Sequence, residues 1–225
     1  MFIGHYGIAY VVKKKASDIP LWLLFASVQL MDIIGFTFTM LGIERVHTVP
    51  NVNHLLRYIT NMPYSHSLSG TLVALVAVYI FFRAIDKKSW AWILGLCVLS
   101  HWFIDLIVHT PDLGIFFNSC KVGLGLWYYP ILTYITELAF FIIGWILLKK
   151  NIYSYLLLIL MVGAATAMIF ADVPPIFNKN ISLTAAGLLI FTLLSIFIAY
   201  LWDRKNKKYS TDSGHRDSRY IYKNE

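Results

Sequence analysis

Four polar side chains follow one another at helical spacing within residues 99–114 of this chain: His101, Asp105, His109 and Asp112. The stretch begins inside an apolar run, and at about 100° per residue the last three lie roughly 40°, 80° and 20° around a helix from His101. All four would therefore share one narrow face. An ionisable stripe on an otherwise apolar helix indicates a functional site. The spacing His-x-x-x-Asp places two metal-ligand side chains one helical turn apart, so a metal ion is the first hypothesis.

The elements that must position these side chains are predicted from composition. Of 225 residues, 58% are hydrophobic and 14% are charged. Soluble domains are about 45–50% apolar and about 25% charged, so this composition is typical of a membrane protein. Six apolar runs approach the roughly 20 residues that a helix needs to cross a bilayer, and they cover residues 20–43, 67–85, 89–109, 127–148, 152–171 and 181–202. We expect an all-α, polytopic membrane protein with about six transmembrane helices, because lipid leaves isolated strands without hydrogen-bond partners.

Residues 1–12 are apolar but too short to span a membrane, and they contain His5. This segment is predicted to be a short N-terminal helix. It can be a re-entrant helix held inside the protein. It can also be an amphipathic helix lying on the membrane surface. Composition alone does not decide between the two.

The formal net charge of +7 is in the range of nucleic-acid-binding proteins, but the distribution of the basic residues argues against a nucleic-acid partner. Lysines and arginines cluster before the first run, between the second and third, between the fourth and fifth, and after the sixth. This is the positive-inside pattern, which predicts that both termini are cytoplasmic. Residues 1–202 then form a single membrane-embedded domain, and residues 203–225 form a basic, disordered cytoplasmic tail.

The charge-derived topology brings the polar residues to similar depths. At a rise of 1.5 Å per residue, Asp32 and His101 would each lie about 18 Å from the cytoplasmic end of their helices, Asp105 about 24 Å and Glu137 about 16 Å. His66 opens the second run on the same outer side. This agreement predicts one site within residues 1–140, near the middle or outer half of the membrane.

The order of these motifs resembles that of the bacterial membrane-bound metal-dependent hydrolase family, which includes the inner-membrane hydrolases of the YdjM type. Within this resemblance the motifs are most similar to those of a bacterial six-helix membrane subgroup. The shared features are Gly4-His5, an aspartate in the first span, Ser65-His-Ser67, and His101-x-x-x-Asp105. The resemblance implies a bacterial inner-membrane protein, and it implies that the metal ligands are His5, Asp32, His66, His101 and Asp105. The broader family usually has Pro-Asp-x-Asp-His in the first span and Arg-Gly-x-Thr-His-Ser before the second. This chain lacks one acid, one histidine and the arginine of those patterns, which leaves open whether one or two ions bind.

The leading hypothesis is a metal-dependent hydrolase that uses a metal-activated water on a phosphoester or other ester bond, with a membrane lipid as a natural substrate. Histidine and carboxylate ligands without thiolates suit Zn²⁺, and also Mn²⁺ or Fe²⁺. The ion would lower the pKa of a bound water to about 7. Glu137, His109 and Asp112 are the candidates for proton transfer or for orienting the ligands. The alternatives are a metal-ion or proton-coupled transporter, because buried His and Asp also mark ion pathways, and a non-enzymatic membrane scaffold.

Overall fold

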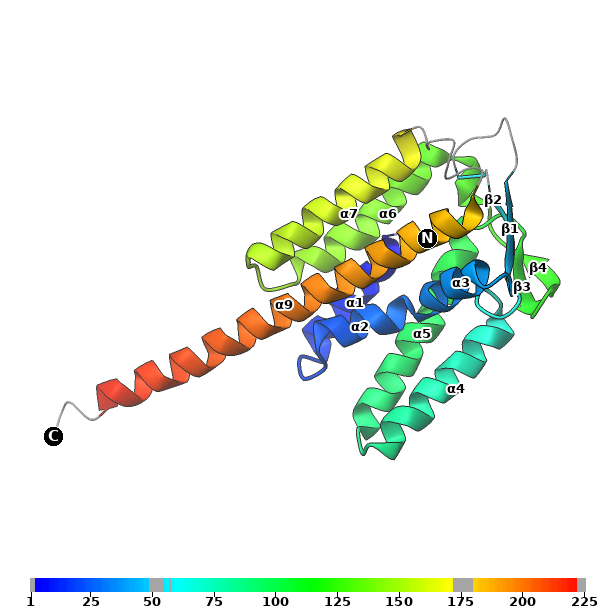
Figure 1. The fold of residues 1–225 in the computed structure, drawn as a ribbon. Helices are drawn as coiled ribbons and strands as arrows, with labels where there is room; N and C mark the ends of the chain where they lie inside the picture. Colours follow the sequence, from blue (N-terminus) through cyan, green and yellow to red (C-terminus); the bar gives the residue numbers. More distant parts are fainter. Residues whose placement is uncertain (1–2, 49–54, 57, 172–179, 222–225) are drawn as a thin grey trace.

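The computed structural model describes residues 3–48, 55–56, 58–171 and 180–221 as a bundle of helices with short β-hairpins at one end (Figure 1). The helices are α1 (Gly4–Lys15), α2 (Leu21–Val28), α3 (Leu30–Met40), α4 (Leu68–Ala84), α5 (Lys88–Val108), α6 (Pro130–Ile146), α7 (Ile152–Phe170) and α9 (Ile181–Ile221). The strands are β1 (Arg45–Thr48), β2 (Tyr58–Asn61), β3 (Leu113–Phe116) and β4 (Ser119–Val122). A 3₁₀ turn, Leu126–Tyr128, precedes α6.

Helices form in all six predicted apolar runs, which confirms a mostly helical fold, but the number of spans is not confirmed. Three helices are long and apolar enough to cross a membrane: α5, α7, and α9 as far as Lys207. α2 and α3 pass the same test only as a pair, bent by 54°. α4 and α6 have 17 residues each and are shorter than a full span. The described residues therefore contain three candidate spans, or four with the bent pair, where the sequence predicts six.

The two β-hairpins are not expected from the sequence, which predicts an all-α chain. β1 pairs with β2 in antiparallel register, with Arg45 opposite Asn61, and β3 pairs with β4 in the same way. Each strand has four residues, too few for a pattern of alternating hydrophobicity to be recognised. Both hairpins lie between the apolar runs, so they do not conflict with the rule against isolated strands in lipid.

The predicted N-terminal helix exists as α1, and it is buried among other helices. α1 packs against α6 and α2, with the side chains of Tyr6, Ala9 and Tyr10 fully buried. A Cβ added to Gly7 would lie 2.2 Å from the carbonyl oxygen of Phe140, so only glycine allows the two backbones to come this close. Burial inside the protein favours the re-entrant alternative over a helix on the membrane surface.

The first predicted span is broken into two helices at Gln29, between α2 and α3. Neither proline nor glycine lies at the break. α2 belongs to the main hydrophobic core, where Leu21, Leu24 and Phe25 are fully buried. The bend redirects α3, which carries Asp32, and frees the carbonyl of Val28 for a tertiary contact described below.

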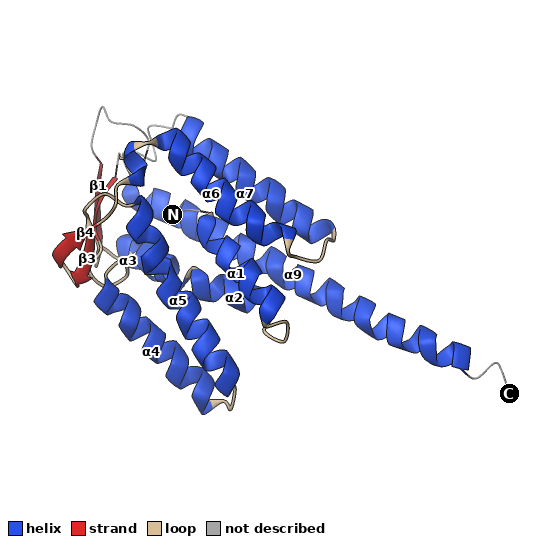
Figure 2. Ribbon diagram, turned by 180° about the vertical axis from the view of Figure 1, so that it is seen from behind, coloured by secondary structure: helices blue, strands red, loops and turns tan. Residues whose placement is uncertain are grey.

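α4 and α5 form an antiparallel helical hairpin, and four of the eight predicted site residues lie on it or at its ends (Figure 2). Ser67 caps the N-terminus of α4, because its hydroxyl accepts a hydrogen bond from the amide of Gly70 at 2.9 Å. A Cβ on Gly70 would lie 1.8 Å from the carbonyl oxygen of Tyr64. This tight approach to the helix fixes the position of His66, one residue before the cap.

α9 continues as one helix from Ile181 to Ile221 and extends beyond the rest of the bundle (Figure 1). It crosses residue 202 without a break and includes most of the segment 203–225 that the sequence predicts to be disordered. The division into a membrane domain and a tail stays a prediction.

Candidate metal centre

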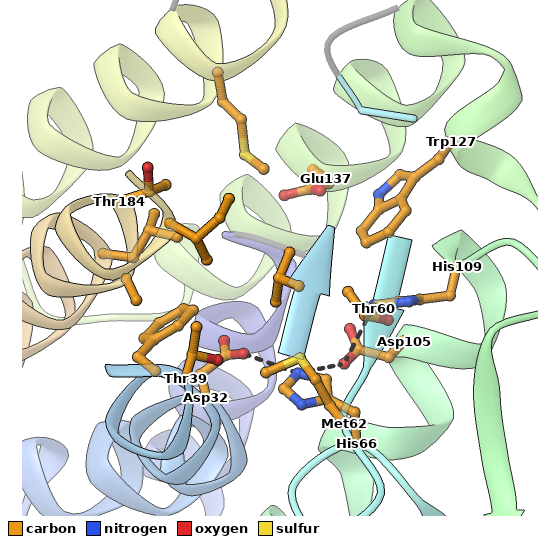
Figure 3. Close-up of a pocket in the computed structure, with 16 residues that line it drawn as sticks. Asp32, Thr39, Thr60, Met62, His66, Asp105, His109, Trp127, Glu137 and Thr184 are labelled. Carbon is orange, nitrogen blue, oxygen red and sulfur yellow. Dashed lines mark hydrogen bonds and ion pairs between the residues drawn. The ribbon is translucent and has the colours of Figure 1, made fainter. Parts of the chain in front are cut away.

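The eight predicted site residues gather at one end of the bundle although they come from distant parts of the chain, and Figure 3 shows five of them, Asp32, His66, Asp105, His109 and Glu137. They are His5 on α1, Asp32 on α3, His66 before α4, His101 and Asp105 on α5, His109 at the end of α5, Asp112 in the turn that follows, and Glu137 on α6.

Four of the five predicted metal ligands surround a common point. The Nε2 atom of His66 lies 3.2 Å from Oδ1 of Asp32 and 3.9 Å from Oδ2 of Asp105. The Nε2 atom of His101 lies 3.7 Å and 3.0 Å from the same two oxygens. Ligands bound tetrahedrally at about 2.0–2.1 Å from one ion are separated by about 3.3 Å. These four N···O separations, from 3.0 to 3.9 Å, are close to that value.

His5 joins the cluster from its other side. Its Nε2 atom lies 3.1 Å from Oδ1 of Asp105, the oxygen that does not face His66 and His101. Its ring stacks on that of His101, with centroids 4.0 Å apart. The ligand atoms of His5, His101 and Asp105 lie within 4.8 Å of one another, and so do those of Asp32, His66 and His101. These buried histidine and aspartate groups can hold a metal ion, and the two overlapping triads leave the number of ions open.

The backbone fixes the orientation of His101. Its Nδ1 atom lies 2.8 Å from the carbonyl oxygen of Val28, at the break between α2 and α3. A carbonyl can only accept a hydrogen bond, so Nδ1 carries the hydrogen. The Nε2 atom, directed at Asp32 and Asp105, has no hydrogen-bond partner among the described residues. Metal-bound histidines in proteins commonly use their second nitrogen in this way, donating it to a carbonyl or carboxylate.

His66 is oriented by side chains that the sequence analysis does not identify. Its Nδ1 atom lies 2.7 Å from the hydroxyl oxygen of Ser65, and that hydroxyl donates to Glu44 at 2.6 Å. Glu44 is only 2% exposed although it lies in the polar segment between the first two apolar runs. Of the two serines that flank His66, Ser67 caps α4 and Ser65 contacts His66.

These contacts leave an electrostatic requirement at the centre of the cluster. When Nδ1 is protonated in a neutral imidazole, Nε2 presents a lone pair. In both His66 and His101 that lone pair faces carboxylate oxygens, which are also acceptors. Such an arrangement is repulsive unless a cation, either a proton or a metal ion, lies between the groups. The donor set therefore fits a divalent cation.

His109 and Asp112 form a hydrogen-bonded pair at the edge of the cluster. The Nδ1 atom of His109 lies 3.0 Å from Oδ1 of Asp112, and its Nε2 atom lies 4.0 Å from Oδ2 of Asp105. Thr60 of β2 donates to the other oxygen of Asp112 at 2.7 Å. Burial acts to raise the pKa of Asp112, but the hydrogen bonds from His109 and Thr60 outweigh it, so the pKa is lowered. Asp112 therefore stays ionised and orients His109.

Glu137 has a different environment from the other acids. Its Oε2 atom accepts a hydrogen bond from the backbone amide of Ile3 at 2.7 Å, which holds the start of α1 against α6. The side chain is 4% exposed and also lines the cavity beside the cluster. Its observed contact positions α1, and hence His5.

A cavity of about 160 Å³ opens beside the cluster and has two unlike sides (Figure 3). One side is polar and includes Asp32, His66, Asp105 and His109. The other is lined mainly by apolar side chains from α3, α7 and α9, namely Phe36, Met168, Ile181, Ala185 and Leu188. A molecule in this cavity would contact both the histidine–carboxylate cluster and helices of the apolar bundle.

Searches found no matching protein-family model, no matching curated protein and no matching solved structure. The resemblance to membrane-bound metal-dependent hydrolases therefore stays an expectation from sequence motifs. The function has to be argued from the site itself.

Proposed function

We propose that the protein is a membrane-embedded, metal-dependent hydrolase that cleaves a phosphoester or other ester bond of a lipid. The observation that carries this proposal is the pair of imidazole Nε2 atoms, of His66 and His101, that lie 3.0–3.9 Å from the oxygens of Asp32 and Asp105 while their Nδ1 atoms are bonded elsewhere. Zn²⁺ is the first choice for this donor set, and Mn²⁺ or Fe²⁺ are the alternatives.

Each residue has a role in this proposal. Asp32, His66, His101 and Asp105 hold the ion, and His5 binds the far oxygen of Asp105. When bound, the ion polarises the oxygen of the scissile group and makes a water molecule more acidic. His109 lines the cavity and takes up a proton at its Nε2 atom. Asp112 meanwhile accepts a hydrogen bond from its other ring nitrogen, Nδ1.

The two sides of the cavity support a lipid substrate. The ester group would lie against His66, Asp105 and His109, and an acyl chain would contact Phe36, Ala185 and Leu188 on α3 and α9. We place the protein in the bacterial inner membrane with both termini cytoplasmic, on the basis of the charge distribution and the sequence motifs. The candidate spans α5, α7 and α9 are compatible with this location.

The first test is the metal content of detergent-purified protein. We expect one or two equivalents of Zn, Mn or Fe per chain, and we expect His101→Ala and Asp105→Ala to lose most of it, since each removes a ligand shared by the cluster. Asp18→Asn is the matched control. Asp18 lies in the turn between α1 and α2, and it accepts a hydrogen bond from Trp90 near the start of α5, far from the cluster at the other end of that helix. A folded wild-type protein that binds no metal even after reconstitution would refute the proposal.

The second test is hydrolysis by the metal-loaded protein. Mixed micelles of a phospholipid and of a neutral diacylglycerol would distinguish phosphoester from carboxylic ester cleavage. Turnover that disappears in Asp105→Ala supports the hydrolase. Metal binding without turnover of either lipid class would contradict the lipid hydrolase while leaving the metal site intact.

One observation favours a second candidate, a metal-ion or proton-coupled transporter. Transporters build ion sites from discontinuous helices near the middle of the membrane, and the broken pair α2–α3 contacts the cluster through Val28 and Asp32. Metal or proton flux into proteoliposomes that requires Asp32 and Asp105, in the absence of hydrolysis, would favour this candidate.

A further inference from the structure

A chain of three side chains leads from the end of α3 to His66. Oε1 of Glu44 accepts hydrogen bonds from the amides of Tyr64 at 2.8 Å and Ser65 at 2.9 Å. Oε2 of Glu44 accepts the hydroxyl hydrogen of Ser65 at 2.6 Å. The Ser65 oxygen lies in turn 2.7 Å from Nδ1 of His66. Glu44 and Ser65 are 2% and 0% exposed, so water does not compete for these bonds.

The direction of every bond in this chain is determined by its first member. A carboxylate has acceptors only, so Ser65 must give its single hydrogen to Glu44. The Ser65 oxygen can then only accept from His66, and Nδ1 must carry the imidazole hydrogen. Nε2 is then the nitrogen that faces Asp32 and Asp105, and it lies within hydrogen-bond distance of Asp32.

We propose that Glu44 is a positioning residue that acts through Ser65 to keep a hydrogen on Nδ1 of His66, so that Nε2 is the nitrogen directed at Asp32 and Asp105. The advantage of keeping the hydrogen on Nδ1 rests on the proposed function, because a metal ion can bind Nε2 only when that nitrogen carries no hydrogen. The tautomer itself can be measured whether or not the protein is a hydrolase.

The backbone around Glu44 makes it suited to this role. The amides of Ile43 and Glu44 both bond to the carbonyl of Phe38, which folds the chain back at the end of α3. The same helix carries Asp32. The carboxylate of Glu44 is therefore held at a fixed place relative to one metal ligand while it orients another.

The decisive variant is Glu44→Gln, which keeps the shape of the side chain but reverses the bonds. The amide oxygen must remain where Oε1 lies, because two buried backbone amides donate there. The amide nitrogen then faces Ser65 and donates to it. Ser65 must turn its hydrogen to Nδ1 of His66, which moves the imidazole hydrogen to Nε2 and blocks the metal-binding position.

The main measurement is the ¹⁵N NMR spectrum of imidazole-labelled, metal-free protein, with His66→Asn used to assign the signals. We expect Nδ1 of His66 to carry a hydrogen in the wild type, whether or not Nε2 also carries one toward Asp32, and to lose it in Glu44→Gln. We also expect metal affinity, measured by competition with a chelator, to fall by about 10–100-fold in Glu44→Gln. An unchanged tautomer in a folded Glu44→Gln protein would overturn the inference.

The two serines beside His66 provide a matched pair of controls. Both are fully buried, but Ser65 contacts His66 and Ser67 caps α4. Ser65→Ala should weaken metal binding and leave His66 as a mixture of tautomers. Ser67→Ala should lower thermal stability while the tautomer of His66 is unchanged. If the two substitutions changed the tautomer of His66 equally, the roles of Glu44 and Ser65 would be structural only. This comparison tests the inference even if Glu44→Gln does not fold.

The outcomes also separate this inference from the proposed function. A tautomer change in Glu44→Gln together with no metal in the wild type would preserve the role of Glu44 and refute the metal site. Metal binding in the wild type that is unaffected by Glu44→Gln would support the metal site and refute the role of Glu44.

Discussion

The protonation of three histidines determines what the cluster can bind. His66, His101 and His109 each direct Nδ1 to an acceptor, which is Ser65, the carbonyl of Val28 and Asp112 respectively. Each leaves Nε2 pointing toward the carboxylates. Three unrelated partners of Nδ1 thus produce the same result, a set of Nε2 atoms directed at one region.

The hydrogen-bonded pair of His109 and Asp112 gives a prediction at the scale of single residues. Asp112→Asn should reduce hydrolytic turnover by about 10²–10⁴-fold, because an amide nitrogen facing Nδ1 would move the imidazole hydrogen to Nε2 and remove the proton acceptor. Metal content should stay at the wild-type level. The measurement is turnover beside metal analysis. Thr60→Val, which removes only the second bond to Asp112, should have a smaller effect, and loss of metal in Asp112→Asn would show that His109 is a ligand instead.

Helical spacing predicts the residues on one helix and misses those that act across the chain. His101 and Asp105 are recognisable because they lie one turn apart in an apolar run, and they do come together. Glu44 gives no such signal, since a single glutamate in a polar segment is usually solvated. The carbonyl of Val28 is a backbone group and carries no side-chain pattern at all.

The elements of the fold are predictable to different degrees. Long apolar runs predict α5, α7 and α9 well, because hydrophobicity over about 20 residues is a strong signal. The bend between α2 and α3 is not predicted, because no proline or glycine marks it and a tertiary bond from His101 uses the freed carbonyl. Strands of four residues are too short to recognise.

The contact between α1 and α6 gives a prediction at the scale of elements. Gly7→Ala should destabilise the protein by about 1–3 kcal/mol, because the added methyl overlaps the carbonyl of Phe140 and must push the helices apart. Gly163→Ala on α7 is the control: nothing lies within 4 Å of the added carbon, so its stability should be equal or slightly higher. Thermal unfolding in detergent measures both. Equal midpoints in the two variants would mean that α1 is not packed as described.

The molecule as a whole is polarised between its two ends. The hairpins, the cluster and the cavity lie at one end, where α5 finishes and α9 begins. Lys13 and Asp203, which pair at 3.6 Å, mark the opposite region. In the topology that we propose from the charge distribution, that region is cytoplasmic and the site lies on the outer side.

The two cysteines test this orientation. Cys120 on β4 is exposed, whereas Cys97 in α5 is buried. In intact spheroplasts a membrane-impermeant maleimide should label the wild type once per chain, at Cys120, and should not label Cys120→Ser. Labelling that requires permeabilised membranes would place the hairpins and the cavity in the cytoplasm.

The hydrogen bond from the amide of Ile3 to Glu137 joins residues 134 positions apart. At about 5–20 residues per second, the ribosome needs roughly 7–27 s to make the chain between them. During that interval α1 has α2 and α5 to pack against, but it lacks α6, the helix that binds its first amide through Glu137. The centre is therefore completed late in synthesis, after His66, His101 and His109 have all been made. Under the proposed function metal loading is then a late step of maturation, and truncated chains that end before α6 should hold His5 less firmly.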